Sequence, residues 1–177
     1  MTTGTGRCPH RTASSPGLKL NRWLRRAKLP PTVPTVPGPT LTQSVTLELL
    51  EATGTPKLVV AELRYELSDP YAVTIAFIVD EFPVSWTFGR DLLTMGLDLY
   101  TPSGDGDVHV WPCFDPSGRA VVIIELTSPD GAALLRAPAR DLSDFARRMT
   151  TAVTPGTESA HLNVDAAIAE ILGAEAA

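Results

Sequence analysis

With 177 residues, 44% of them hydrophobic, the chain is long enough to bury one core of ordinary size. Residues 1–40 hold seven basic and no acidic side chains, which leaves eight basic against twenty acidic side chains in residues 41–177. A body with a net charge near −12 repels polyphosphate chains, so this composition disfavours nucleic-acid binding. The two cysteines, Cys8 and Cys113, are too few for a disulfide framework, and we expect them to stay unbridged in a reducing compartment.

Residues 1–40 differ in composition from the rest of the chain. They contain seven of the sixteen prolines and too few large apolar side chains to offset the entropy cost of ordering. We therefore interpret residues 1–40 as a basic, proline-rich disordered tail or linker, and residues 41–177 as the single domain. No unbroken apolar run follows the basic residues, so an export signal is not expected. A start codon assigned too far upstream is an alternative origin of this leader.

One segment of the leader, residues 18–29, has the pattern of a short basic amphipathic helix. Leu20, Trp23 and Leu24 recur at helical spacing, and Arg22 and Arg25 lie on the other side. Such a helix is suited to the surface of an anionic membrane. A helix of about twelve residues is marginal on its own, so we regard peripheral membrane contact as the weaker interpretation.

After Thr40 the sequence alternates between apolar and polar residues, which is the pattern of half-buried strands. In residues 56–67, for example, Val59, Ala61 and Leu63 alternate with charged side chains. Residues 119–126 are apolar almost throughout, which predicts a strand that needs cover on both faces. The predicted strands cover residues 42–50, 56–67, 71–80, 83–88, 106–114 and 119–126.

Helices are predicted between and after these strands. Residues 89–97 have Gly96 near their end, where we expect a cap with positive φ. Residues 138–153 begin with Pro138 in the first turn, and Asn163 is a suitable cap for a last helix with Ile168 on its inward side. Strands in meander order, interrupted by two to three flanking helices, predict an α+β domain with antiparallel β-sheets.

The clearest candidate for chemistry is the stretch from Ser103 to Asp115. If it is extended, five side chains share one face, including two carboxylates, an imidazole and a thiol. They are Asp105, Asp107, His109, Trp111 and Cys113. One flat strand face alone does not provide the tetrahedral convergence of a zinc site, so we favour a structural strand. A metal-dependent hydrolase centred on Asp107, His109 and Cys113 remains the competing hypothesis.

Other signs of catalysis are weak. The chain has no glycine-rich phosphate loop, no paired-cysteine motif and no Gly-x-Ser-x-Gly elbow. Glu125 is the one carboxylate marked by an apolar setting, and a salt bridge at an edge or between subunits is the favoured interpretation. The residues therefore predict no catalytic residue, no metal and no cofactor.

Five motifs together resemble a known family. They are SDPYAV (68–73), WTFGRDLLTMGL (86–97), GDVHVWP (106–112), LTSPDGAALLRAPARDLSDF (126–145) and TPGTE (154–158). In this order and at this spacing, they make residues 41–177 resemble the SsgA-like proteins, the sporulation and cell-division regulators of filamentous actinobacteria. The basic leader falls outside the resemblance. In similar sequences the third motif reads Gly-Asp-Val-x-Val-Trp-Pro, so His109 and Cys113 occupy variable positions.

The resemblance implies a non-enzymatic regulator of sporulation-specific cell division. Such a protein is cytoplasmic, lies at the division septum, and positions or organises FtsZ and the septum machinery through protein–protein contacts, with SsgA-like paralogues as further partners. The implied fold is similar to the whirly-type single-stranded nucleic-acid-binding domains, and the implied assembly is a bell-shaped homotrimer. The alternative is a single-stranded nucleic-acid-binding protein that uses this fold and the basic tail.

Two places are candidates for contact with a partner. Gly156 and Glu158 lie in a Pro-Gly turn that precedes the last predicted helix, and an exposed rigid turn is a suitable docking point. Arg90 and Asp91 begin the helix of the second motif. For this charged pair a structural role at the helix N-terminus is favoured over recognition.

Overall fold

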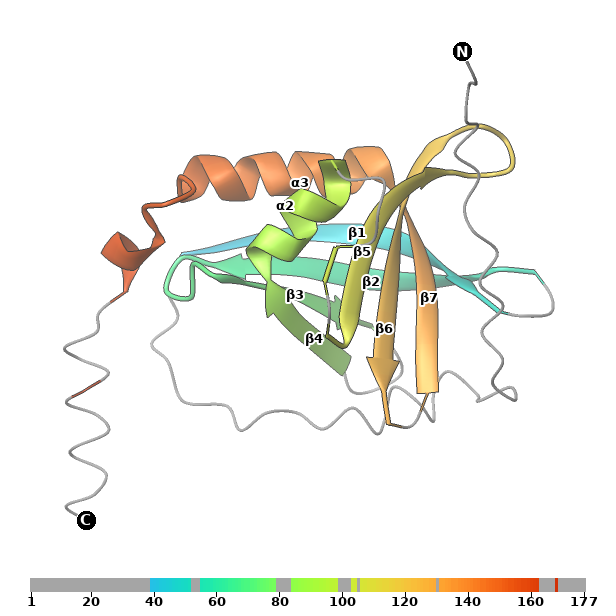
Figure 1. Cartoon of the computed structure of the whole chain (residues 1–177), viewed down its shortest axis with the longest axis horizontal. Helices are drawn as coiled ribbons and strands as arrows, with labels where there is room; N and C mark the ends of the chain where they lie inside the picture. The colour runs from blue at the N-terminus through green and yellow to red at the C-terminus, as the bar shows by residue number, and fades with distance from the viewer. Residues whose placement is uncertain are drawn as a thin grey trace.

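A computed structural model describes residues 39–51, 55–78, 84–98, 103–104, 106–129, 131–162 and 168. The described residues form a seven-stranded sheet in the order β4-β3-β2-β1-β7-β6-β5, in which neighbouring strands are antiparallel (Figure 1). The strands are β1 (Thr40–Leu50), β2 (Lys57–Glu66), β3 (Ala72–Phe77), β4 (Val84–Gly89), β5 (Val108–Phe114), β6 (Ala120–Ser128) and β7 (Gly131–Pro138). The helices are α2 (Arg90–Asp98), α3 (Ala139–Ala152) and the short 3-10 helix η1 (Glu158–His161).

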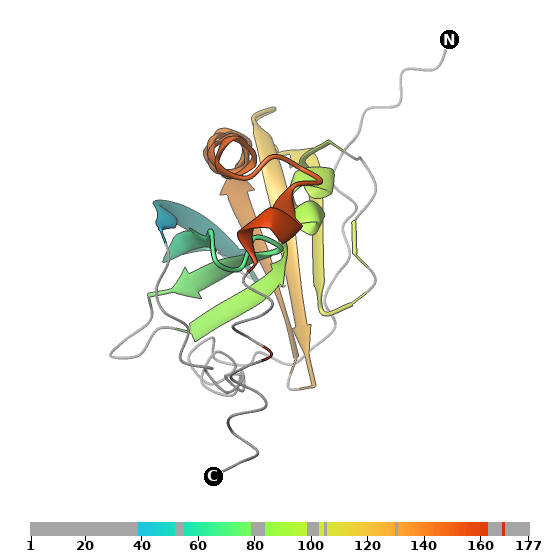
Figure 2. The same ribbon diagram turned by 90° about the vertical axis from the view of Figure 1, so that its left-hand side faces the viewer.

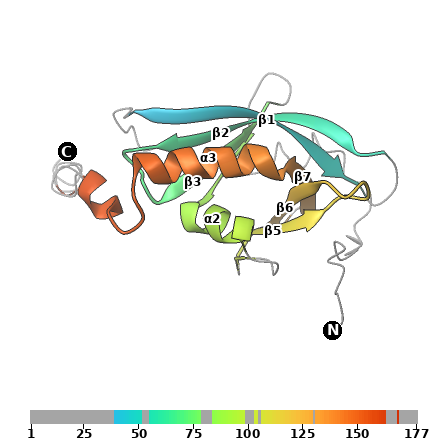
Figure 3. The same ribbon diagram turned by 90° about the horizontal axis from the view of Figure 1, so that it is seen from above.

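The sheet is curled, and both α-helices cover the same face of it. Figure 2 shows β1–β4 and β5–β7 as two halves that meet at an angle, and Figure 3 shows α2 and α3 lying over the strands. Alternate residues of the strands pack with Leu93 of α2 and with Leu142, Phe145 and Met149 of α3 in one buried core. The predicted α+β class, the antiparallel pairing and the flanking helices are therefore confirmed.

A second, smaller cluster lies on the opposite face of the sheet, which we call the outer face. It consists of Trp111, Cys113, Val121 and Ile123, with Leu50 and Leu134 packed against them. On β6, Val122 and Ile124 point into the main core, whereas Val121 and Ile123 point into the outer cluster. Residues 121–124 are therefore buried on both faces, as predicted for this apolar strand, whereas Arg119 and Ala120 are exposed.

Three expectations about individual residues are wrong. Gly96 is not a cap with positive φ but lies inside α2, where it faces Val110 of β5. Pro138 is the last residue of β7 and has extended backbone angles, so α3 begins one residue later. Ile168 is helical, but its side chain is about half exposed. The rest of the predicted last helix, including Asn163, lies outside the described residues, as does the leader through residue 38.

The β5–β6 hairpin is closed by a turn that Asp115 organises. Its Oδ1 accepts hydrogen bonds from the Ser117 hydroxyl at 2.6 Å, from the Ser117 N–H at 2.8 Å and from the Arg119 N–H at 2.9 Å. Its Oδ2 accepts one from Arg119 Nε at 2.7 Å. The Ser117 hydroxyl, followed by the Arg119 N–H, holds the pKa of the Asp115 carboxyl well below its usual range.

This shift predicts a pH-dependent contribution to stability. Because the pKa of Asp115 is lower in the folded chain, the stabilisation is present above the unfolded pKa of about 3.9 and is lost as the pH falls below that value. Asp115→Asn is expected to destabilise the protein at pH 7 more than at pH 3. Urea unfolding of the wild type and of Asp115→Asn at pH 7 and pH 3 measures this effect. An equal loss in the free energy of unfolding at the two pH values would contradict the prediction.

Candidate functional site around Arg90

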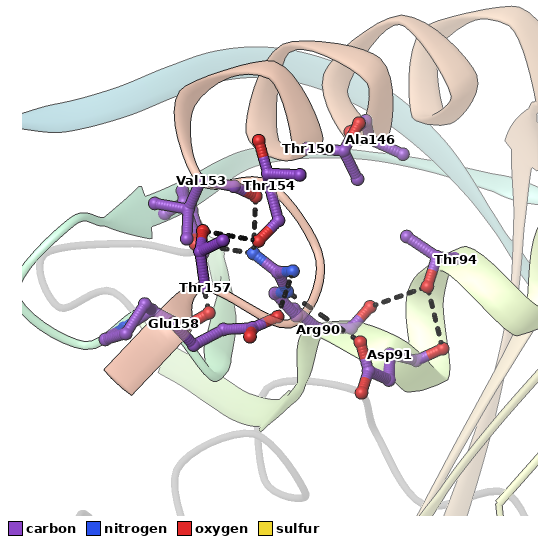
Figure 4. Close-up of polar contacts among 11 residues, drawn as sticks. Arg90, Asp91, Thr94, Ala146, Thr150, Val153, Thr154, Thr157 and Glu158 are labelled. Carbon is purple, nitrogen blue, oxygen red and sulfur yellow. Dashed lines mark hydrogen bonds and ion pairs between the residues drawn. The ribbon is translucent and has the colours of Figure 1, made fainter. Parts of the chain in front are cut away.

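The most unusual side chain of the described residues is Arg90, which is 1% exposed. Its Nη1 donates hydrogen bonds to the Tyr65 hydroxyl and to the Val153 carbonyl oxygen, each at 3.0 Å. Its Nη2 forms an ion pair with Glu158 Oε1 (Figure 4). Its Nε lies 3.7 Å from Asp91 Oδ1. The guanidinium is therefore held from several sides by groups of this chain.

These partners come from segments that are far apart in the sequence. Strand β4 ends at Gly89 and α2 starts at the next residue, so the Arg90 side chain enters the core where strand and helix meet. Its backbone N–H donates to the Tyr71 carbonyl oxygen at 2.8 Å, and the Tyr65 hydroxyl donates to the Pro70 carbonyl oxygen at 2.9 Å. Arg90 thus joins the β2–β3 turn, the start of α2, the end of α3 and η1.

The ion pair between Arg90 and Glu158 is buried on both sides, with 2% and 10% of the side-chain surfaces exposed. Removing two charges from water is costly, and this cost is offset only where the remaining donors and acceptors are also satisfied. Here the Tyr65 hydroxyl and the Val153 carbonyl oxygen accept two further hydrogen bonds from Arg90. The pair therefore fixes the segment that follows α3 against the body of the domain.

The structure brings the four candidate contact residues into one region. Arg90 and Glu158 are buried against each other, while the Asp91 side chain is 76% exposed and Gly156 is exposed. The contact role of these four residues remains a prediction. If it holds, a partner contacts Asp91 and the turn at Gly156 directly, and the buried pair acts as a support. The role of Tyr65 does not follow from the sequence, because its alternating position indicates only a core side chain.

Gly156 has the expected positive φ, at +89°, and a Cβ added there would meet no atom within 4 Å. Gly156→Ala is therefore expected to lower the free energy of unfolding by about 1–2 kcal/mol through backbone strain alone. Gly106 is the matched control, because it also has open space around it but lacks a positive φ. Thermal or urea unfolding measures the stability of Gly156→Ala and Gly106→Ala. Equal stability of the two variants would contradict backbone strain at position 156.

The residues of the competing metal hypothesis do not converge. Asp107 is exposed, Trp111 and Cys113 are buried in the outer cluster, and Asp105 lies outside the described residues. His109 is the cross-strand neighbour of Glu125, with its Nδ1 3.7 Å from Glu125 Oε2. Within the described ranges, no three His, Cys, Asp or Glu residues are grouped as a metal site. Glu125 thus faces His109 of the same chain.

The prediction that neither cysteine forms a disulfide is wrong for Cys113. Cys113 takes part in a disulfide, although we expected both cysteines to stay unbridged. Cys8, the other cysteine of the chain, lies outside the described residues.

No helix in the described part of the chain is both long enough and apolar enough to cross a membrane.

Solved structures define the class of protein to which this fold belongs. A crystal structure of an SsgA-like sporulation-specific cell division protein from Thermobifida fusca matches with a TM-score of 0.67 and 40% identity, and covers 77% of this chain and 98% of its own. A second structure, described under "Mutations in SsgB correlate to longitudinal cell division during sporulation of Streptomyces coelicolor", matches with a TM-score of 0.65 and 44% identity. It covers 72% of this chain and 98% of its own. The curled antiparallel sheet with two helices is therefore the fold of SsgA-like sporulation-specific cell division proteins.

The sequence comparisons agree with this class. Residues 59–158 match the family model "Streptomyces sporulation and cell division protein, SsgA", and the chain belongs to this family. "Sporulation-specific cell division protein SsgB" of Streptomyces coelicolor is 50% identical over 113 residues, which are 63% of this chain and 80% of the relative. The protein of the same name from Thermobifida fusca is 43% identical over 136 residues, which are 76% and 96% of the two chains.

These matches confirm the resemblance to the SsgA-like proteins and the association with sporulation and cell division. The family is one of cell-division regulators and is not a known enzyme family. The alternative function, single-stranded nucleic-acid binding, receives no support from the names of these relatives.

Proposed function

We propose that this protein is a non-enzymatic regulator of sporulation-specific cell division that positions or organises FtsZ and the septum machinery through protein–protein contacts. The observation that carries the proposal is the buried Arg90–Glu158 pair, which holds the exposed turn at Gly156 beside the exposed Asp91 in the first turn of α2. Both residues lie within residues 59–158, the part that matches the family of cell-division proteins. A surface that is held rigidly loses little entropy on binding, which suits a docking role.

The finer parts of this proposal rest on family membership. The protein acts in the cytoplasm at the division septum, as a homotrimer with a fold similar to the whirly-type domains. Its partners are FtsZ, other division proteins and SsgA-like paralogues. The contact surface includes Asp91, which is exposed beside Arg90, and the turn at Gly156.

Co-sedimentation of the full chain with FtsZ polymers tests this function. We expect the protein to pellet with the polymers, and Asp91→Ala to weaken the apparent affinity about fivefold, as for a contact worth about 1 kcal/mol. Arg140→Ala is the matched control, because Arg140 is 89% exposed but lies on α3. Absence of co-sedimentation would reject the FtsZ role, whereas equal binding by both variants would reject only the proposed contact surface.

Localisation provides an independent measurement. A fluorescent fusion of the full chain, and one without residues 1–36, are both expected to mark sporulation septa together with FtsZ. A fusion that stays diffuse throughout sporulation would contradict the septal role.

A further inference from the structure

The outer face of the sheet carries an exposed apolar patch that no described segment covers. Leu58 and Val60 of β2 are 72% and 45% exposed, and Ile78, which follows β3, is 60% exposed. The Ile78 N–H donates to the Val60 carbonyl oxygen at 2.9 Å, so these two residues are direct neighbours across the strands. We call Leu58, Val60 and Ile78 the outer patch. An exposed group of large apolar side chains is a common mark of an interaction site.

Charged side chains around the outer patch are paired within the chain. Glu48, the cross-strand neighbour of Leu58, forms an ion pair with Arg136 of β7. Glu62 pairs with Arg64, and Lys57 Nζ lies 2.7 Å from Glu51 Oε1. The centre of the surface is therefore apolar and its rim carries partly exposed carboxylates in surface ion pairs, which are weak and exchange partners readily. An occupant with an apolar face and basic flanks fits this surface.

The chain itself contains such a segment. In residues 18–29, Leu20, Trp23 and Leu24 recur at helical spacing, with arginines on the other side. The whole leader has a charge of +7 against about −12 for residues 41–177, so the two attract each other. Because a helix of about twelve residues is marginal alone in water, it needs an apolar surface to stabilise it.

The connection between this segment and the domain has a suitable length. The described chain starts at Pro39, whose carbonyl oxygen accepts a hydrogen bond from the Leu67 N–H at the far end of β2. Leu58 lies opposite Glu48, eight residues along β1 from Thr40, which corresponds to about 27 Å. Residues 30–39 are rich in proline and span about 31 Å as polyproline II. The linker therefore reaches from the start of β1 to the outer patch.

We propose that residues 18–29 bind the outer patch of the same chain as an amphipathic helix. The apolar side chains of Leu20, Trp23 and Leu24 pack on Leu58, Val60 and Ile78. Lys19 and Lys28, at the two edges of the apolar face, lie beside the carboxylates of the rim, and the arginines on the other side of the helix face solvent. The leader is then an intramolecular cover of the outer sheet face, and a macromolecule that binds this face has to displace it.

Limited proteolysis of the full chain with trypsin tests this inference. Cleavage after Arg22, Arg25 and Arg26 is followed by mass spectrometry in a reducing buffer, so that the disulfide at Cys113 plays no part. When opening is fast, the cleavage rate follows the population of the open form. The double variant Leu58→Thr/Val60→Thr places β-branched residues with high strand propensity at both positions and is expected to be cut in the leader about tenfold faster than the wild type.

Met95→Thr is the matched control, because Met95 is 51% exposed but lies on α2. It is expected to leave the cleavage rate unchanged. Trp23→Ala alone is expected to accelerate cleavage about as much as Leu58→Thr/Val60→Thr. When it is added to that double variant, no further acceleration is expected, because the residues contact each other. Equal cleavage of the wild type and the double variant would overturn the proposal. Protection that increases with protein concentration would overturn it as well, because the segment would then bind another copy.

Discussion

Glu158→Ala is expected to lower the free energy of unfolding by about 3–5 kcal/mol. The reason is that Arg90, 1% exposed, then stays buried without its carboxylate, and the loss of a partner costs more than the pair itself contributes. Urea-induced unfolding, followed by circular dichroism, measures the change. Asp91→Ala is the control, because this carboxylate also lies near Arg90 but is 76% exposed, and we expect a change below about 0.5 kcal/mol.

Replacing both members of the pair separates the effect of a lone buried charge from the effect of lost packing. Arg90→Met/Glu158→Met is expected to be more stable than Glu158→Ala, because it leaves no buried charge. The two positions are in contact, so their effects are not additive. If the free energy of unfolding of Glu158→Ala lay within about 1 kcal/mol of the wild-type value, this result would contradict the burial of the pair.

Gly96→Ala is expected to be the second strongly destabilising substitution, at about 1–3 kcal/mol. Alanine normally stabilises the interior of a helix by about 0.5–1 kcal/mol relative to glycine. At this position, however, an added Cβ would lie 2.5 Å from both Cβ and Cγ1 of Val110 and 2.9 Å from its carbonyl oxygen. Since real Cβ atoms do not approach so closely, α2 has to move away from β5, and the overpacking outweighs the gain in propensity.

Gly89→Ala is the matched control for this substitution. Gly89 has no atom within 4 Å of an added Cβ and no positive φ, so we expect a neutral or slightly stabilising effect. In the background Val110→Ala, one of the three close contacts of Gly96→Ala, the one with Cγ1, is removed, so the destabilisation by Gly96→Ala is expected to be smaller. Thermal unfolding of the variants gives the comparison. Equal stability of Gly96→Ala and Gly89→Ala would show that α2 and β5 are not packed so closely.

Residue patterns predict the strands better than they predict the contacts between them. Alternating or continuous apolar residues predict six of the seven strands, but not β7. Its alanines, Ala132, Ala133 and Ala137, have low strand propensity, and the strand forms because it pairs with both β1 and β6. Gly96 was assigned to a helix end by a local rule, whereas its position depends on Val110, which belongs to another element.

In the candidate site, too, local residue patterns do not predict the contacts between distant segments. From the sequence, Arg90 and Glu158 are separate candidates for contact with a partner. Their ion pair joins positions 68 residues apart, which only the folded chain brings together. The face formed by His109, Trp111 and Cys113 lies on a strand, as predicted, whereas Asp107 precedes this strand. The pairing of His109 with Glu125 of the next strand does not follow from the sequence.

The order of the strands determines which strand pairs carry the largest entropy cost of loop closure. Strands β1 to β4 form one meander and β5 to β7 another, and within each meander every strand pairs with its neighbour in sequence. Among the described residues the meanders are joined by three backbone pairs between β1 and β7, from Glu48–Arg136 to Leu50–Leu134. The entropy cost of closing a long loop therefore falls on one short seam, whereas the hairpins on either side are local. Helix α3 packs against β1, β6 and β7, and so it lies across this seam and holds the two meanders together.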